Sequence, residues 1–100
     1  MSKKRVLPTF SIGDQVEWTS QAAGTVRTKR GEVVAVVSRG VRYQDALRSL
    51  REERGEQFSQ HFDGGLPREH ESYFVAVSNP SGRGKRKLYW PRTSALRATP

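Results

Sequence analysis

The residues of this sequence best suited to chemistry are cations that stand beside an aromatic ring near the C-terminus. Arg83, Lys85, Arg86, Lys87 and Tyr89 follow one another on a predicted hairpin. Lys and Arg bind phosphates while rings stack on nucleobases, so this pattern is typical of a protein that holds nucleic acid. The alternative is an edge hairpin whose cations only discourage pairing with another chain, with the adjacent Trp90 belonging to the core.

Two further groups of cations are candidate binding residues. Arg27, Lys29 and Arg30 lie on the predicted first hairpin, and in a small barrel that hairpin can lie near the second one, so that both groups form one surface. The alternative is a solvated turn. A third group lies on a predicted helix and would suit an acidic protein partner, or would simply be its solvated face; it comprises Arg48, Arg51 and Arg54.

Catalytic and metal-binding chemistry has little support. The only constellations are His61 with Asp63 and the run 69–71, and neither has a recognised ligand spacing. Five rings could line a cage for a methylated side chain, although a barrel of this size needs most of them as core; they are Tyr43, Phe58, Phe62, Tyr73 and Phe74. We expect no enzyme, no metal or other cofactor, and no small-molecule substrate.

Composition favours a polyanionic or acidic partner. The 100 residues suit one domain, Cys is absent, and 18 basic against 10 acidic residues give a net charge of +8. Of the basic residues 13 are Arg, whose planar fork matches phosphate and carboxylate groups. Residues 1–43 sum to +5, residues 44–72 to −3 and residues 73–100 to +6, which indicates an acidic segment inserted into a basic framework.

Hydropathy predicts a soluble protein. The longest apolar run is the five residues 33–37, far short of a bilayer span, and the basic N-terminus lacks the apolar stretch of a secretory signal. We therefore expect a cytoplasmic location and no membrane partner.

Periodicity predicts short strands and one helix. A disordered basic tail over 1–8 precedes a strand over 15–19, a loop over 20–24 and a turn at Lys29-Arg30-Gly31. A valine-rich strand over 32–37 leads to a helix over 42–54 and an irregular connection over 56–71. The remaining elements are strands over 72–78 and 85–90, a 3₁₀ turn over 92–94 and a last strand over 95–97.

The alternation within these strands also predicts a single core, with Trp90 at its margin. Its members are Val16, Trp18, Val34, Val36, Val75, Val77, Leu88 and Leu96.

Four short motifs carry a resemblance to a known family. The segments Gly13-Asp14-Gln15-Val16-Glu17-Trp18, 31–37, Tyr73-Phe74-Val75-Ala76-Val77 and Ser94-Ala95-Leu96-Arg97 resemble the Tudor-like domain of small bacterial hypervirulence-associated proteins, and more distantly KOW-type barrels. The resemblance implies a mainly β fold, a small SH3-like or Tudor-like five-stranded barrel over 9–98. The helical and irregular insertion at 41–71 departs from the family pattern.

The sequence therefore leads to two functional hypotheses. The first is a small binding module that holds DNA or RNA through phosphates with little sequence specificity, because the cations are many and no base-reading helix motif is recognisable. The second is an adaptor or inhibitor, of the kind that mobile elements encode, that binds an acidic protein through the barrel surface or the inserted helix.

Overall fold

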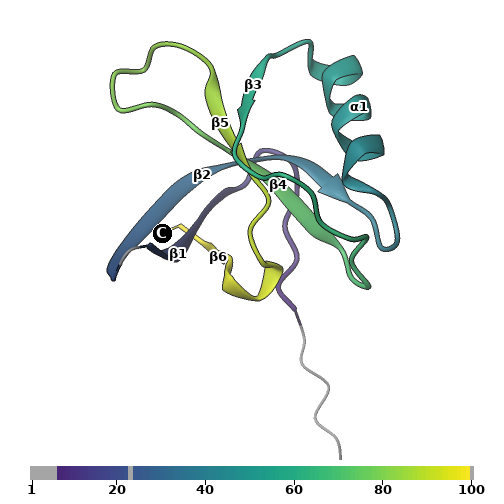
Figure 1. The fold of residues 1–100 in the computed structure, drawn as a ribbon, viewed down its shortest axis with the longest axis horizontal. Helices are drawn as coiled ribbons and strands as arrows, with labels where there is room; N and C mark the ends of the chain where they lie inside the picture. Colours follow the sequence, from purple (N-terminus) through teal and green to yellow (C-terminus); the bar gives the residue numbers. More distant parts are fainter. Residues whose placement is uncertain (1–6, 23, 100) are drawn as a thin grey trace, which may run out of the picture.

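The computed structural model describes residues 7–22 and 24–99, which form six strands, one α-helix and one 3₁₀ turn (Figure 1). The predicted tail over 1–8 therefore lies outside the described residues except for Leu7 and Pro8. The elements are β1 (Gln15–Ala22), β2 (Thr25–Val37), α1 (Tyr43–Arg54), β3 (Phe58–Gln60), β4 (Ser72–Val77), β5 (Arg86–Tyr89), η1 (Thr93–Ala95) and β6 (Arg97–Ala98).

All six strands belong to one open, mixed sheet in the order β3-β5-β4-β2-β1-β6. Neighbouring strands are antiparallel except for β3 and β5, which are parallel. The mainly β prediction is confirmed, but the sheet has six strands where five were expected. The additional strand is β3, whose three residues fall in the segment predicted to be irregular and are too few to produce a periodic pattern.

The predicted turn at Lys29-Arg30-Gly31 is wrong, because β2 runs through these residues without a break. Gly31 has another purpose. A Cβ atom there would overlap the carbonyl oxygen of Ala76 and the side chain of Val75. Glycine is therefore needed where β4 approaches β2 closely, next to the first β2–β4 pair, Glu32 with Ala76.

The sheet is strongly curved. The β2–β4 register shifts between Val33 and Ala35, and such a bulge bends the bulged strand. Trp18 on β1 and Tyr89 on β5 have ring centroids 5.6 Å apart, although β2 and β4 lie between those strands. Across a flat sheet, three strand spacings would separate the two residues by about 14 Å. The contact thus requires the sheet to curl on the side that carries both rings.

The core consists of two clusters, on opposite sides of the sheet, rather than the single core predicted. On the α1 side lie Val34, Val37, Leu47, Leu50, Phe74, Ala76, Leu88 and Trp90. On the other side lie Val16, Trp18, Val33, Tyr73, Val75 and Leu96. Val36 and Val77, which were predicted to be buried, are only partly so. Trp90 is buried rather than marginal, and its indole N–H donates a 2.9 Å hydrogen bond to the Ser72 hydroxyl.

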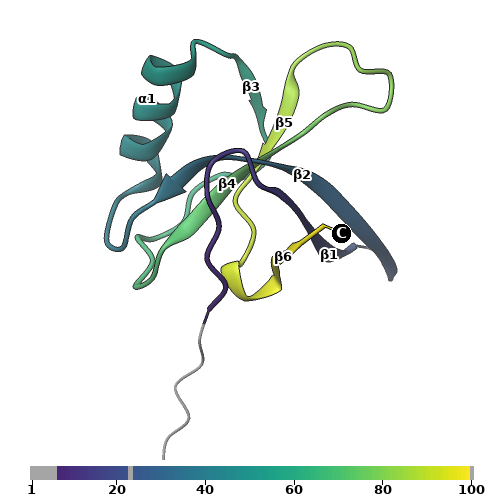
Figure 2. The ribbon, with the colours of Figure 1, turned by 180° about the vertical axis from the view of Figure 1, so that it is seen from behind.

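The predicted helix is confirmed as α1. Leu47 and Leu50 are its buried residues, and Gly55 ends it with a φ of 65°, donating its N–H to the Arg51 carbonyl. Seen from either side, α1 lies at the opposite end of the molecule from the tip of the β1–β2 hairpin and the β4–β5 connection (Figures 1 and 2). Within the described part of the chain, no helix has the length and apolar content needed to cross a bilayer.

Candidate nucleic-acid interface

The two hairpins contribute side chains to one side of the curved sheet. Lys87 and Tyr89 pair with Val77 and Val75, which places them on the side away from α1. Lys29 pairs with Trp18 on that same side of the β1–β2 hairpin. We call the resulting surface the basic–aromatic face; its residues are Arg27, Lys29, His61, Lys87 and Tyr89, and the buried Trp18 packs against Tyr89.

A contact between Lys29 and Tyr89 joins the two hairpins. The Lys29 ammonium lies 5.3 Å from the centroid of the Tyr89 ring, and it donates a 2.7 Å hydrogen bond to the Ser20 hydroxyl. A cation over a ring is attracted by the negative face of the π-system. One cation of the first predicted group, Lys29, is therefore brought against the ring of the second group, Tyr89.

His61 completes this face, although sequence analysis did not assign it a binding role. Its ring lies 5.2 Å from the Tyr89 ring at an interplanar angle of 34°. Its backbone N–H donates to the Leu88 carbonyl at 2.8 Å, which continues the pairing of β3 with β5. His61 is exposed and Tyr89 half-buried, so His61 is the outer ring of the pair. No periodic pattern marked it, because it follows a three-residue strand in an irregular segment.

Arg86, assigned by sequence to the same cationic strip, faces the α1 side instead. Its guanidinium donates 2.8 Å hydrogen bonds to both carboxylate oxygens of Glu56 and to Glu32. The hydrogen bonds to Glu56 raise the pKa of Arg86 above its ordinary value, and the same contact lowers the pKa of the Glu56 carboxyl. Arg54 adds bridges of 3.6 Å to Glu32 and 3.5 Å to Glu56. Arg86 and Arg54 are thus committed to a structural ion network.

The other predicted binding cations are dispersed. Arg83 is exposed in the β4–β5 connection, where the Asn79 amide donates to the carbonyls of Arg83 at 2.7 Å and Lys85 at 3.1 Å. Lys85 borders a hollow shared with Glu56 and the end of α1. Arg30 lies on the opposite side of β2 from Lys29, with its Nε 3.9 Å from a Glu17 oxygen.

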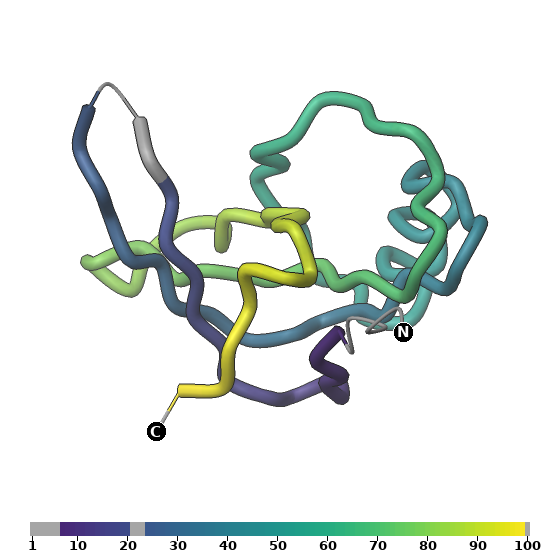
Figure 3. The backbone as a smooth tube through the Cα atoms, turned by 90° about the horizontal axis from the view of Figure 1, so that it is seen from below, coloured from purple at the N-terminus to yellow at the C-terminus, as the bar shows by residue number. Residues whose placement is uncertain are grey.

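The cations of the basic–aromatic face form no ion pair with the other described residues. Among the described residues, no carboxylate oxygen lies within 4 Å of a charged nitrogen of Arg27, Lys29 or Lys87, and the same holds for Arg83. Figure 3 shows the first residues of β2 at the end of the molecule where the β4–β5 connection also projects. An uncompensated, projecting cationic surface attracts polyanions.

The rings considered for a methyl-binding cage serve as core. Phe62 stacks on Phe74 at 5.3 Å and contacts Tyr43 at 5.7 Å. Tyr73 belongs to the cluster on the opposite side of the sheet from Phe74. The five rings therefore do not surround one cage.

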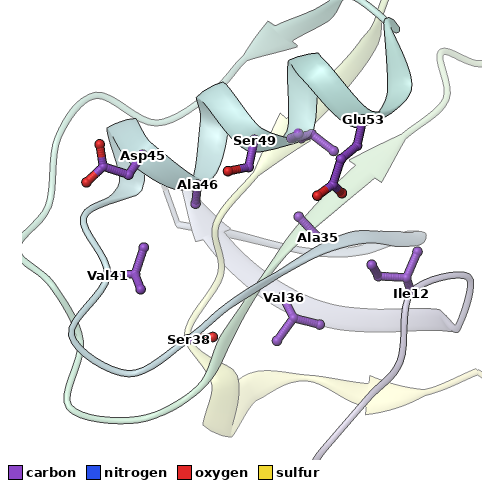
Figure 4. Close-up of a pocket in the computed structure, with 10 residues that line it drawn as sticks. Ile12, Ala35, Val36, Ser38, Val41, Asp45, Ala46, Ser49 and Glu53 are labelled. Carbon is purple, nitrogen blue, oxygen red and sulfur yellow. The ribbon is translucent and has the colours of Figure 1, made fainter.

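A hollow between α1 and β2 has the opposite character to the basic–aromatic face (Figure 4). Small and apolar side chains, including Ala35, Val41 and Ala46, line it together with the carboxylates of Asp45 and Glu53, and none of its described lining residues is a Lys or Arg. Such a hollow does not suit a phosphate. Within the ranges 7–22 and 24–99, no cluster of three or more His, Cys, Asp or Glu residues is arranged to hold a metal ion.

The helix arginines are also divided. Arg48 and Arg51 are exposed and border a shallow hollow with Tyr43 and Gln60, whereas Arg54 belongs to the ion network. The predicted protein-binding set is therefore reduced to two available cations.

Comparison of the chain with protein families, with curated proteins and with solved structures finds no match.

Proposed function

We propose that this protein is a non-enzymatic module that binds nucleic acid, DNA or RNA, through phosphates at the basic–aromatic face, with little sequence preference. The observation that carries the proposal is the contact of Lys29 with Tyr89 across the two hairpins. It brings cations without a described carboxylate partner beside the contacting rings of Tyr89, His61 and Trp18, and a combination of cations and rings suits a single-stranded polyanion.

Each part of the face has a role in this proposal. Arg27, Lys29 and Lys87 contact phosphate oxygens, and the exposed His61 ring supplies a surface on which a base can stack. Base reading by a helix is disfavoured, because α1 lies at the other end of the molecule and carries Asp45, Glu52 and Glu53. Binding through phosphates and stacking is sequence-tolerant.

An SH3-like or Tudor-like classification of the sheet is part of the same proposal. The curl that brings Trp18 onto Tyr89, the bulge in β2 and the 3₁₀ turn before the last strand support it. In this view α1 and β3 form an insertion that extends the sheet by one parallel strand.

A second candidate function is an adaptor or inhibitor that binds an acidic protein through α1. Arg48 and Arg51 support it, because both are exposed on the same helix face. The nucleic-acid proposal is favoured since its cations are more numerous and lie beside rings.

A salt titration of binding tests the proposal. The variant Arg27→Gln/Lys29→Gln/Lys87→Gln removes three charges from the face. Its matched control, Arg39→Gln/Arg48→Gln/Arg51→Gln, removes three exposed charges elsewhere, including both available helix arginines. Affinity for mixed-sequence single- and double-stranded oligonucleotides is measured from low to physiological salt.

We expect the wild type and the control to show a log–log salt slope of about −3 on duplex, because each phosphate contact contributes about −0.9. The face variant should lose both affinity and slope. Salt-insensitive binding by the wild type, or equal binding by the face variant, would reject the proposal. Loss of binding only in the control variant would favour a binding site on α1 instead.

A further inference from the structure

A cationic hollow is lined by residues of η1 and by Leu7 at the start of the described chain. These segments lie away from the β4–β5 connection (Figure 1). Among the described lining residues of the hollow three are basic, two carry hydroxyl groups and none carries a carboxylate side chain; the residues are Leu7, Arg68, His70, Arg92, Thr93 and Ser94. These residues belong to three segments that are far apart in the sequence and lie close together in the folded chain.

Arg68 is held rigidly at this hollow. Its guanidinium carbon lies 3.9 Å from the centroid of a Trp90 ring, and its two terminal nitrogens donate to the Pro91 carbonyl at 2.8 Å and the Trp90 carbonyl at 3.0 Å. A guanidinium has five N–H donors, so three remain for another acceptor. A donor group fixed in this way loses little conformational entropy when it binds a ligand.

Arg92 places a second positive charge near the first. Burial, followed by the positive charge of Arg92, lowers the pKa of Arg68. Two like charges that line one hollow repel each other. Within the described residues, no carboxylate oxygen lies within 4 Å of a charged nitrogen of either one. An anion between two such groups would relieve their repulsion and accept their unused N–H donors.

We propose that this hollow is an oxyanion site that binds a phosphate group between Arg68 and Arg92. Ser94 supplies a hydroxyl donor, whereas the Thr93 hydroxyl already donates to the Glu71 carbonyl at 3.1 Å. His70 adds a further N–H donor at the rim. The site does not depend on the basic–aromatic face, and its phosphate comes either from the free ion or from the end of a nucleic acid strand.

Nuclear magnetic resonance of the full chain tests the site. Inorganic phosphate is titrated at constant ionic strength, balanced with sodium chloride, while the Arg68 Nε–H and the Ser94 amide are followed. We expect saturable shifts at both groups. Absent shifts, or shifts that chloride reproduces at equal ionic strength, would overturn the proposal.

Variants of Arg92 show whether two guanidiniums are needed. Arg92→Gln should weaken phosphate binding at least about tenfold, because it removes charge-assisted hydrogen bonds. Arg92→Lys keeps the charge without the fork and should fall between that variant and the wild type. Arg39→Gln, an exposed control of the same charge loss, should bind phosphate as the wild type does. Equal binding by all four proteins would reject the site.

Two oligonucleotides separate the sources of the phosphate. A dinucleotide with a 5′-phosphate and the same dinucleotide without it are titrated in turn. If the terminal phosphate is the source, only the first should shift the Ser94 amide. If inorganic phosphate alone does so, the site takes the free ion. The variant Lys29→Gln/Lys87→Gln should retain these shifts, so failure of the nucleic-acid proposal would leave this one intact.

Discussion

Arg86 and Lys87 are neighbours on β5, yet they belong to two different environments. Arg86 points to the α1 side, where its side chain is 22% exposed and bridged to Glu32 and Glu56. Lys87 points to the side away from α1, where no described carboxylate lies within 4 Å of its ammonium group. One residue of offset along a strand thus separates a structural cation from a candidate ligand-binding one, since the side-chain period is two.

The two sides of the sheet differ in the same way as a whole. On the α1 side, charges neutralise one another in a network that ties β2, the end of α1 and β5 together. On the side away from α1, cations lie beside rings and form no ion pair with the described carboxylates. A count of basic residues along the sequence therefore overstates the number available to a polyanion.

The largest expected effect comes from the core on the α1 side. Phe74→Ala should lower the free energy of unfolding by about 3–5 kcal/mol, because Phe74 is fully buried against Phe62 and Trp90. Chemical denaturation measures this loss. His61→Ala, on the side away from α1, should change the free energy of unfolding by less than about 0.5 kcal/mol. Equal losses of stability in the two variants would contradict the assignment of Phe74 to the core and of His61 to an exposed surface.

The next effect distinguishes the neighbouring cations. Arg86→Met should cost about 1–3 kcal/mol, because Glu32 and Glu56 lose their hydrogen-bonded partner while remaining partly buried. Lys87→Met should cost less than about 0.5 kcal/mol but weaken oligonucleotide binding. Thermal and urea unfolding, together with binding at low salt, give both quantities. If Lys87→Met lost more stability than Arg86→Met, the assignment of Arg86 as the structural cation would be wrong.

A smaller effect concerns the outer ring. His61→Ala should weaken single-stranded binding by about 1 kcal/mol, or about fivefold, through lost stacking. His61→Phe, which keeps a flat ring, should restore it. Fluorescence anisotropy with a labelled mixed-sequence oligonucleotide measures both. If the Phe variant binds as weakly as the Ala variant, stacking is not the role of this ring.

The smallest effect is in the pH dependence of stability. Arg86 lowers the pKa of the Glu56 carboxyl in the folded protein below its ordinary value of 4.5. The stabilisation that the ion pair gives to the folded state is therefore complete above pH 4.5, and it is lost as the pH falls through the lower pKa of the folded state. The stability gap between wild type and Arg86→Met should therefore narrow below about pH 4.5. Urea unfolding at pH 7 and in acid measures the gap. A gap that widens in acid would contradict the assigned direction.

Sequence analysis predicted the regular elements well where periodicity was strong. Alternation identified β4, helical spacing identified α1 and its end at Gly55, and Pro91 with the following residues indicated η1. The errors arose where tertiary contacts decide. Gly31 was interpreted as a turn residue, but close approach of Ala76 requires it. The strand β3 exists only because β5 provides a partner.

The candidate site was predicted in part. Lys87 and Tyr89 lie on the predicted returning strand, whereas Lys29, expected in a turn, lies within β2. Their meeting depends on the curl of the sheet, which local sequence does not encode. Arg86 was grouped with Lys87 because a local sequence pattern cannot indicate its ion-pair partners Glu56 and Glu32, which are 30 and 54 residues away. His61 was missed for the same reason, since its ring matters only beside Tyr89.

The most direct test of the basic–aromatic face is a map of backbone amide shifts when a mixed-sequence single-stranded 12-mer is added to the ¹⁵N-labelled protein at low salt. We expect the largest shifts at Lys29, His61, Lys87 and Tyr89, with little change along α1. Shifts concentrated at Arg48 and Arg51, or no shifts at any residue, would contradict it.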